Sequence, residues 1–361
     1  MRKLYLGFIF SLLNLIILQT SIAFEQVSIA DSQTRTLQSE IVNQEYQLLI
    51  QLPGGYPQSN KTYPVIYFLD AQWDFPLMVS TYGQSYYDGF IPEAILVGIQ
   101  WGGENPDPNV LRARDFTPTT VPEVSNSGGS ARFLRFIKQE LIPFIKNEYQ
   151  VNDQRILMGS SYGGLFTLYT LFNEPNLFNG YIPTSSASNW DKGILYSYAK
   201  NFDKKKLTQP IRLYSAIGEY DDLMPAFDDL ERFFIKLNVP GINTKFERLS
   251  GLGHASLKSA GNTWGLHYVF AKPNLALSEA ELLEFVGQYQ EKASQTRVNV
   301  VMEQGQLNIK LDAKSHTLHA ASENDFYQIG ELFEVSFESK VQSKKMVITN
   351  FFGSRTFYPV E

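Results

Sequence analysis

The stretch that decides the fold is Arg155-Ile156-Leu157-Met158-Gly159-Ser160-Ser161-Tyr162-Gly163-Gly164. Its first four residues are typical of a short buried strand, and an apolar helix pattern follows over residues 164–172. Between them, residues 159–163 match G-x-S-x-G, the nucleophile elbow, in which a sharp strand-to-helix turn exposes the central serine. The turn is expected to leave no room for side chains at Gly159 and Gly163. Alone, the pattern also fits a packed glycine turn, but its setting between strand and helix favours Ser161 as a nucleophile.

The segments around this turn predict an α/β fold. Strand-length apolar runs without alternation suit strands that are buried on both faces, as in a parallel sheet. Helices are expected between them, one with Ser130 as its N-cap. Strands that alternate with helices predict a doubly wound, mostly parallel sheet, preceded by two β segments within residues 34–52. Together with the elbow, this sheet is of the α/β-hydrolase type. The expected strands cover residues 63–69, 94–99, 155–158, 211–217 and 244–249, and the helices cover residues 133–145, 164–172 and 226–237.

The pattern changes near Pro273. A helix is expected over residues 278–290, with Ser278 and Glu281 at capping-box spacing. Short alternating segments separated by turn residues follow, and they predict a small antiparallel β domain. The expected organisation is a signal peptide at 1–23, an α/β-hydrolase domain at 24–273 and the β domain at 274–361. The alternating segments are residues 298–301, 306–311, 333–337, 345–349 and 355–358.

The N-terminus has the pattern of an export signal. Arg2 and Lys3 precede an apolar run over residues 4–18, and the small residues of Ser21-Ile22-Ala23 predict cleavage after Ala23. A retained anchor is the alternative, but the run is short for a span and no basic cluster follows it. We therefore expect an exported protein, periplasmic or secreted, without a stable membrane anchor.

Composition excludes several kinds of chemistry. The chain has no cysteine, which excludes disulfides, zinc–thiolate sites, a cysteine nucleophile and a lipoprotein anchor. The formal net charge is −6, so the chain lacks the basic face of a nucleic-acid-binding protein. No metalloprotease or EF-hand motif occurs, so neither a metal nor a cofactor is expected. The oligomeric state is not indicated.

Ser161 requires a base, because an unassisted hydroxyl stays protonated at neutral pH. Of the four histidines, His316 and His319 fall in the predicted β domain, and His267 falls in an apolar helical stretch. His254 lies in a glycine-flanked loop after the last predicted strand of the α/β sheet, where the base of this fold is found. His254 is therefore the predicted base.

The acid of a triad should follow the preceding strand, and Gly218-Glu219-Tyr220-Asp221-Asp222 stands there. Asp221 is the first choice, Asp222 the second and Glu219 the third. The carboxylate would fix the imidazole tautomer and stabilise the imidazolium. The alternative is that these acids are solvated charges near a helix start.

An oxyanion hole requires two N–H donors aimed at the developing charge. Tyr162, directly after the nucleophile, is the first predicted donor. The second is expected from the loop after the strand at 63–69, with Gln72 favoured over Ala71.

Several further stretches resemble the esterase family of α/β-hydrolases that includes esterase D, feruloyl esterases, mycolyltransferase antigens and siderophore esterases. The resemblance implies a triad of Ser161, Asp221 and His254. The family's usual glycine and histidine are replaced here by Ala71 and Ser160. The residues after the last helix resemble the small β domain appended to bacterial serine hydrolases. The similar stretches are residues 63–70, 112–119, 128–129, 140–143, 159–164, 185–190 and 254–264.

These observations predict a serine esterase that acts on a small-molecule ester, of the siderophore or aryl-ester type. Arg112 and Arg114 would either meet an anionic substrate or form internal salt bridges to Asp115 or Glu93. The alternatives are an acyltransferase of the same fold and a non-catalytic binding protein.

Overall fold

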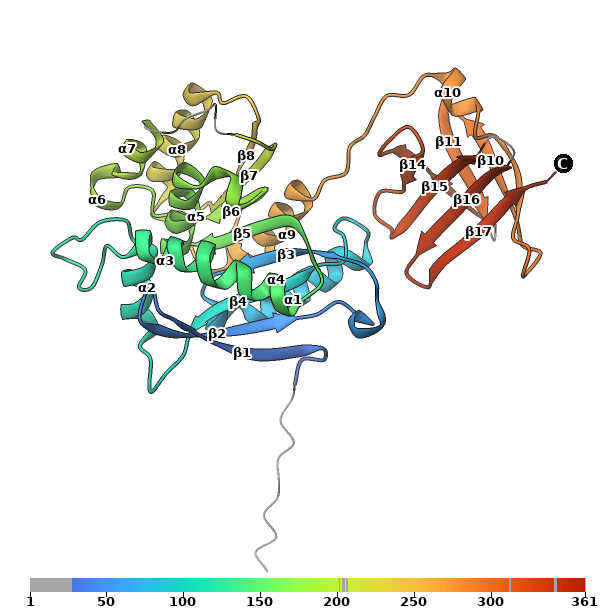
Figure 1. The fold of residues 1–361 in the computed structure, drawn as a ribbon. Helices are drawn as coiled ribbons and strands as arrows, with labels where there is room; N and C mark the ends of the chain where they lie inside the picture. The colour runs from blue at the N-terminus through green and yellow to red at the C-terminus, as the bar shows by residue number, and fades with distance from the viewer. Residues whose placement is uncertain are drawn as a thin grey trace, which may run out of the picture. The chain divides into compact units, whose positions relative to one another are not determined.

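A computed structural model describes residues 28–200, 202, 205, 207–311, 313–340 and 343–360. The predicted signal peptide at 1–23 lies outside these residues. By its contacts the chain divides into residues 1–30 and residues 31–361, and both sheets of Figure 1 belong to the second unit. No helix within the described ranges has the length and hydropathy needed to cross a membrane.

The first sheet consists of β1 (Ser32–Ser39), β2 (Gln44–Gln51), β3 (Tyr63–Phe68), β4 (Ile95–Trp101), β5 (Val151–Ser160), β6 (Gly180–Thr184), β7 (Ile211–Gly218) and β8 (Ile242–Leu249). Their order is β1-β2-β4-β3-β5-β6-β7-β8. The pairs β1–β2 and β2–β4 are antiparallel, and all the other pairs are parallel. Every residue of β3 and β6 is buried, and for β3 this accounts for its continuous apolar run. The predicted mostly parallel α/β fold is confirmed.

Helices cover this sheet in two groups. One group consists of α1 (Ala71–Tyr87) and α9 (Leu257–Val269), which contact each other, with α9 on β6 and β7. The other centres on α5 (Tyr162–Asn173), which packs on β5 and β6 and contacts α2 (Pro108–Phe116), α3 (Ser130–Phe136) and α7 (Leu195–Lys200). The other helices between β2 and β8 are η1 (Tyr56–Gln58), η2 (Ile137–Leu141), α4 (Ile142–Glu148), η3 (Pro175–Leu177), α6 (Trp190–Gly193) and α8 (Met224–Leu237).

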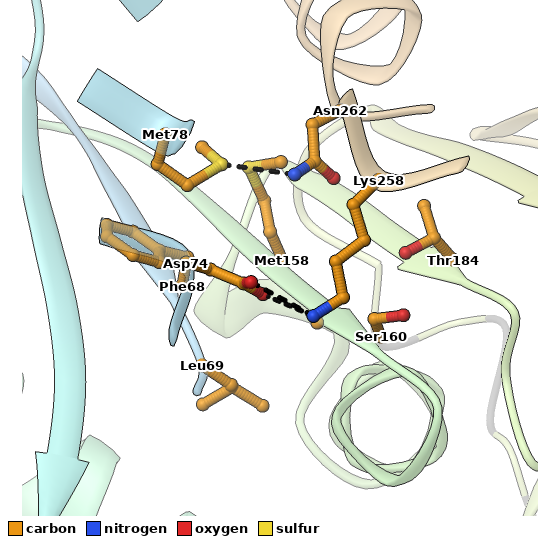
Figure 2. A pocket seen from close by; sticks show the side chains of 10 residues that line it. Phe68, Leu69, Asp74, Met78, Met158, Ser160, Thr184, Lys258 and Asn262 are labelled. Carbon is orange, nitrogen blue, oxygen red and sulfur yellow. Dashed lines mark hydrogen bonds and ion pairs between the residues drawn. The ribbon is translucent and has the colours of Figure 1, made fainter. Parts of the chain in front are cut away.

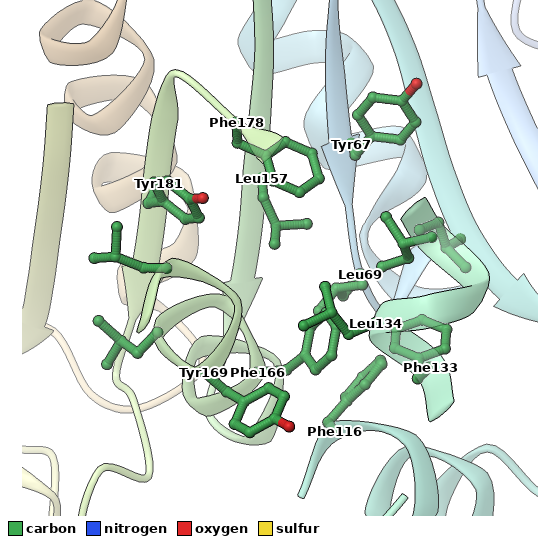
Figure 3. Packing of buried hydrophobic residues seen from close by; sticks show 14 of the residues in the cluster. Tyr67, Leu69, Phe116, Phe133, Leu134, Leu157, Phe166, Tyr169, Phe178 and Tyr181 are labelled. Carbon is green, nitrogen blue, oxygen red and sulfur yellow. The ribbon is translucent and has the colours of Figure 1, made fainter. Parts of the chain in front are cut away.

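Successive strand residues point to these two groups in turn, as the pleat requires. Tyr181 belongs to the buried cluster that includes Phe166 of α5 (Figure 3). Its neighbour Ile182 faces α9, where a Cβ on Gly265 would lie 2.6 Å from Ile182 Cγ2. The sheet is therefore covered on both faces, and its strand ends are left for the site.

The helical segment predicted over residues 133–145 is present but longer, and η2 within it is a π-helical turn. The prediction of Ser130 as N-cap is wrong. Gly129 holds that position, and Ser130 is the first residue of α3. The Ser130 hydroxyl is buried without a hydrogen-bond partner among the described residues, so it caps no backbone N–H group.

A buried polar cluster lies where β2, β4 and α2 meet. Asp115, 1% exposed, accepts hydrogen bonds from Tyr46 Oη at 2.7 Å and Trp101 Nε1 at 2.8 Å. Arg114 adds two more, at 2.7 and 3.0 Å. Burial, followed by the charge of Asp115, raises the pKa of Tyr46 far above its ordinary value. One carboxylate thus satisfies donors from three elements.

Replacing Asp115 with Ala is expected to lower the free energy of unfolding by about 3–5 kcal/mol, because Arg114 loses its partner and two buried donors lose their acceptor. Guanidinium denaturation followed by tryptophan fluorescence measures the change. Asp153→Ala is the control, since that carboxylate is 89% exposed and should contribute less than about 0.5 kcal/mol. A loss below about 1 kcal/mol for Asp115→Ala, within the range of an exposed ion pair, would show that the cluster does not stabilise the fold.

The second sheet is antiparallel throughout, with nine strands in the order β12-β11-β10-β9-β17-β16-β15-β14-β13. Its two edge strands are joined by a single residue, Leu318, so the sheet curls until it is nearly closed. It has its own core, which includes Phe285, Val335 and Phe357. The strands are β9 (Gly287–Gln290), β10 (Arg297–Glu303), β11 (Gln306–Leu311), β12 (Lys314–Thr317), β13 (His319–Ala320), β14 (Asp325–Tyr327), β15 (Phe333–Lys340), β16 (Ser343–Asn350) and β17 (Gly353–Pro359).

The predicted antiparallel β domain is confirmed, with one correction. The helix expected over residues 278–290 ends early: α10 spans Glu279–Leu283, and β9 follows it. The capping box of Ser278 and Glu281 is present. The boundary between residues 273 and 274 stays a prediction, and it falls between α9 and α10.

Candidate active site

The turn of the predicted elbow consists of a single residue. β5 ends at Ser160 and α5 begins at Tyr162, so Ser161 alone makes the turn, with φ 60° and ψ −117°. Its N–H donates to Thr184 O at 3.0 Å, and its carbonyl accepts from Leu165 N at 2.9 Å and Ala187 N at 3.2 Å. The backbone is thus fixed on both sides, and Ser161 lies at the carboxyl end of β5.

The glycines of the elbow differ in how much space surrounds them. A Cβ on Gly159 would lie 2.5 Å from the Gly163 carbonyl, so the turn does exclude a side chain there. The same expectation for Gly163 is wrong, because a Cβ at that position would meet nothing closer than 3.5 Å. The tight second position is Gly164, where a Cβ would lie 2.9 Å from Thr184 O. That glycine lets α5 approach the end of β6.

Two of the predicted site residues, Asp221 and His254, lie in contact. Asp221 follows β7 and is 5% exposed, and its Oδ2 lies 2.9 Å from His254 Nδ1. Oδ2 also accepts from Ser185 Oγ at 2.5 Å, and Oδ1 accepts from Leu223 N at 3.0 Å. The carboxylate is therefore held by three donors, while the imidazole side chain remains 46% exposed.

Ser161 is connected to this pair through the last residue of β6 and the residues that follow it. Thr184 and Ala187 bond the serine backbone, and Ser185 between them bonds Asp221. In the described chain, no hydrogen bond joins Ser161 Oγ to the His254 ring. The structure therefore places Asp221 against His254 and Ser161 at the same carboxyl edge of the sheet. A contact between a catalytic serine and its histidine is often long until substrate binds.

The other candidates for acid and base lie elsewhere. Asp222 is exposed. Glu219, also at the surface, accepts from Gly251 N and Ser250 Oγ, and these bonds lower its pKa. His267 stacks on Phe90, and burial lowers its pKa. His316 and His319 lie in the second sheet.

The two predicted oxyanion donors start helices. Tyr162 is the first residue of α5, and Gln72 is the second residue of α1. The structure gives the N–H groups of Tyr162, Ala71 and Gln72 no acceptor in its described part. Asp70, which directly precedes Ala71, adopts a left-handed backbone conformation with φ 59°. Residues 71 and 72 were expected in a loop, but α1 begins at Ala71, so both N–H groups belong to a helix N-terminus, which favours negative charge.

Arg112 and Arg114 form internal salt bridges. Arg114 binds Asp115, one of the predicted partners. Arg112 binds instead to Asp70, with Nε at 3.1 Å from Oδ1 and a terminal nitrogen at 3.0 Å from Oδ2. The Arg112 guanidinium also lies 5.2 Å from the Tyr162 ring centre. Arg112 thus contacts both Asp70, the residue before α1, and Tyr162, the first residue of α5.

The sequence analysis did not predict two residues that contact the candidate site residues. Ser185 is a second partner of the acid, and Asp70 anchors Arg112. The only sequence signal for either was its place in a stretch that resembles the esterase family. Within the residues described, no group of three His, Asp or Glu side chains is placed to hold a metal ion.

Comparisons with known proteins agree on a family. Residues 39–239 match the family model described as "Putative esterase". The ferri-bacillibactin esterase BesA of Bacillus subtilis is 33% identical over 66% of this chain and 88% of its own. Two solved structures share the fold. The BES protein from Bacillus cereus has a TM-score of 0.64 with 25% identity, over 69% of this chain and 98% of that one. An IroE-like serine hydrolase from Shewanella oneidensis has a TM-score of 0.60 with 27% identity, over 70% and 85%. The chain therefore belongs to this esterase family of α/β-hydrolases.

Proposed function

We propose that this protein is an exported serine esterase that uses Ser161 as nucleophile, His254 as base and Asp221 as the acid of a triad. The observation that carries the proposal is the 2.9 Å contact between Asp221 Oδ2 and His254 Nδ1. This contact fixes the tautomer in which Nδ1 bears the proton, which leaves Nε2 free to accept one. The elbow presents Ser161 at the edge of the sheet where that imidazole lies.

The reaction would proceed in two halves. His254 takes the proton from Ser161 Oγ as the oxygen attacks the ester carbonyl, and Asp221 stabilises the imidazolium. The N–H groups of Tyr162 and of Gln72 or Ala71 stabilise the negative charge on the tetrahedral oxygen. The alcohol leaves with the proton from His254, and an acyl group remains on Ser161. Water, activated by the same imidazole, then releases the acid.

The substrate we propose is a siderophore or aryl ester. The relative from Bacillus subtilis is named a ferri-bacillibactin esterase, and the chain matches most of its length. Trp73, in the first turn of α1, and Tyr220, next to the acid, are 50% and 72% exposed, and exposed aromatic rings favour flat ligands. Export is supported by the signal pattern at 1–23.

A fluorophosphonate probe tests the proposed nucleophile directly. We expect the purified protein to be labelled, and Ser161→Ala to be unlabelled. No labelling, or equal labelling of both proteins, would favour the non-catalytic binding protein.

A substrate panel tests the reaction class. It should contain p-nitrophenyl esters, a feruloyl ester and an iron-loaded catecholate trilactone, each assayed with and without an acceptor alcohol. Release of the acid in the presence of the alcohol supports hydrolysis, whereas a dominant new ester product would favour the acyltransferase.

A further inference from the structure

A small crevice of about 10 Å³ lies directly behind the elbow. Figure 2 shows Ser160 and Thr184, from the ends of β5 and β6, facing Asp74 of α1 and Lys258 of α9. Ser160, the last residue of β5, lines this crevice, whereas Ser161 follows it and makes the turn. The crevice therefore lies between the elbow and the helices α1 and α9.

An ion pair closes this crevice. Lys258 Nζ donates to both oxygens of Asp74, at 3.0 and 2.8 Å. The two side chains are only 20% and 15% exposed, compared with 46% and 38% for the surface pair of Lys138 and Glu174. Burial raises the pKa of the Asp74 carboxyl, and the Lys258 ammonium opposes that shift. Loss of the lysine would leave a poorly solvated carboxylate.

The pair joins the two helices that carry opposite parts of the site. Asp74 lies in the first turn of α1, whose opening N–H groups at residues 71 and 72 are the proposed oxyanion donors. Lys258 lies in the first turn of α9, four residues after His254. One turn further along, Asn262 Nδ2 donates to Met78 Sδ at 3.2 Å across the same interface. The ion pair therefore links the first turn of α1 to the first turn of α9, the helix that follows the His254 loop.

We propose that Asp74 and Lys258 are positioning residues for ester hydrolysis, holding the N-terminus of α1 and the His254 loop in the geometry that the transition state requires. The inference rests on the proposed function. Neither side chain touches the reacting atoms. A displacement of about 1 Å at such a site is expected to lower the rate about 100-fold, so the pair should affect kcat more than KM.

The test compares Lys258→Met, Lys258→Arg and Asp74→Glu with the unmodified protein, using p-nitrophenyl acetate. We expect Lys258→Met to lower kcat by about 10- to 100-fold with KM changed less than about 3-fold, since only the transition-state geometry is lost. Lys258→Arg keeps the charge and the reach and should stay within about 3-fold of the original kcat, because it can still bind the carboxylate. Lys138→Met removes an exposed ion pair and is the matched control.

The rate of fluorophosphonate labelling and the melting temperature complete the measurement. A folded Lys258→Met protein with unchanged kcat would overturn the inference, as would an equal fall for Lys138→Met. If Lys258→Met does not fold, Asp74→Glu decides, because it keeps both charges and inserts one methylene: a lower kcat at an unchanged melting temperature supports positioning, and an unchanged kcat overturns it. If the unmodified protein itself neither labels nor hydrolyses, the proposed function has failed instead.

Discussion

Replacing Ser161 with Ala is expected to lower kcat for ester hydrolysis by about 10⁶-fold, the loss typical of a serine hydrolase without its nucleophile. His254→Ala should lose about as much, because the hydroxyl then has no acceptor for its proton. The double variant should be no slower than either single variant, since the two groups act as one unit. Steady-state rates on p-nitrophenyl acetate measure the effect.

His319→Ala serves as the control for histidine loss, because that residue lies in the second sheet. It should keep the original rate. Effects of Ser161→Ala and His254→Ala that multiply in the double variant would mean that serine and histidine act independently. That result would contradict the proposal that Ser161 and His254 act together as a catalytic pair.

Asp221→Asn is expected to lower kcat by about 10⁴-fold with the fold intact. Asp221 Oδ2 now accepts from both His254 Nδ1 and Ser185 Oγ. With an amide nitrogen facing the imidazole, Nδ1 must become the acceptor, so the ring proton moves to Nε2. That nitrogen is then unable to take the proton of Ser161.

The neighbouring Asp222→Asn is the matched control, because its side chain is exposed and the same change there alters only a surface charge. It should change kcat less than about 2-fold, consistent with the small effect of a surface substitution. A large fall for Asp222→Asn together with a small one for Asp221→Asn would exchange their roles. Melting temperatures separate lost catalysis from lost folding.

The sequence predicted the strands that are long and strongly apolar, and it missed those that tertiary packing decides. β6 is only five residues long and includes Pro183, so it has neither alternation nor strong strand propensity. α1 contains Pro76, which interrupts a helical pattern. β13 has two residues, and no local pattern marks so short an edge strand.

The sequence predicts site residues where chain order constrains them, and it leaves alternatives open where side-chain direction decides. The order of serine, acid and histidine pointed to Ser161 and His254. It ranked Asp221 before Asp222 and Glu219 but did not separate them decisively, because all three follow the same strand and differ in which way their carboxylates point. Ser185 and Asp70 act through contacts between distant segments, and such contacts leave no local pattern in the sequence.

Ser161 adopts φ 60° and ψ −117°, a conformation that costs an L-residue about 1–3 kcal/mol. A glycine at this position would relieve that cost and remove the hydroxyl in the same step. The backbone conformation of the proposed nucleophile thus lowers the stability of the folded protein. A Ser161→Gly protein is therefore expected to be more stable than the original and to lack the proposed nucleophile.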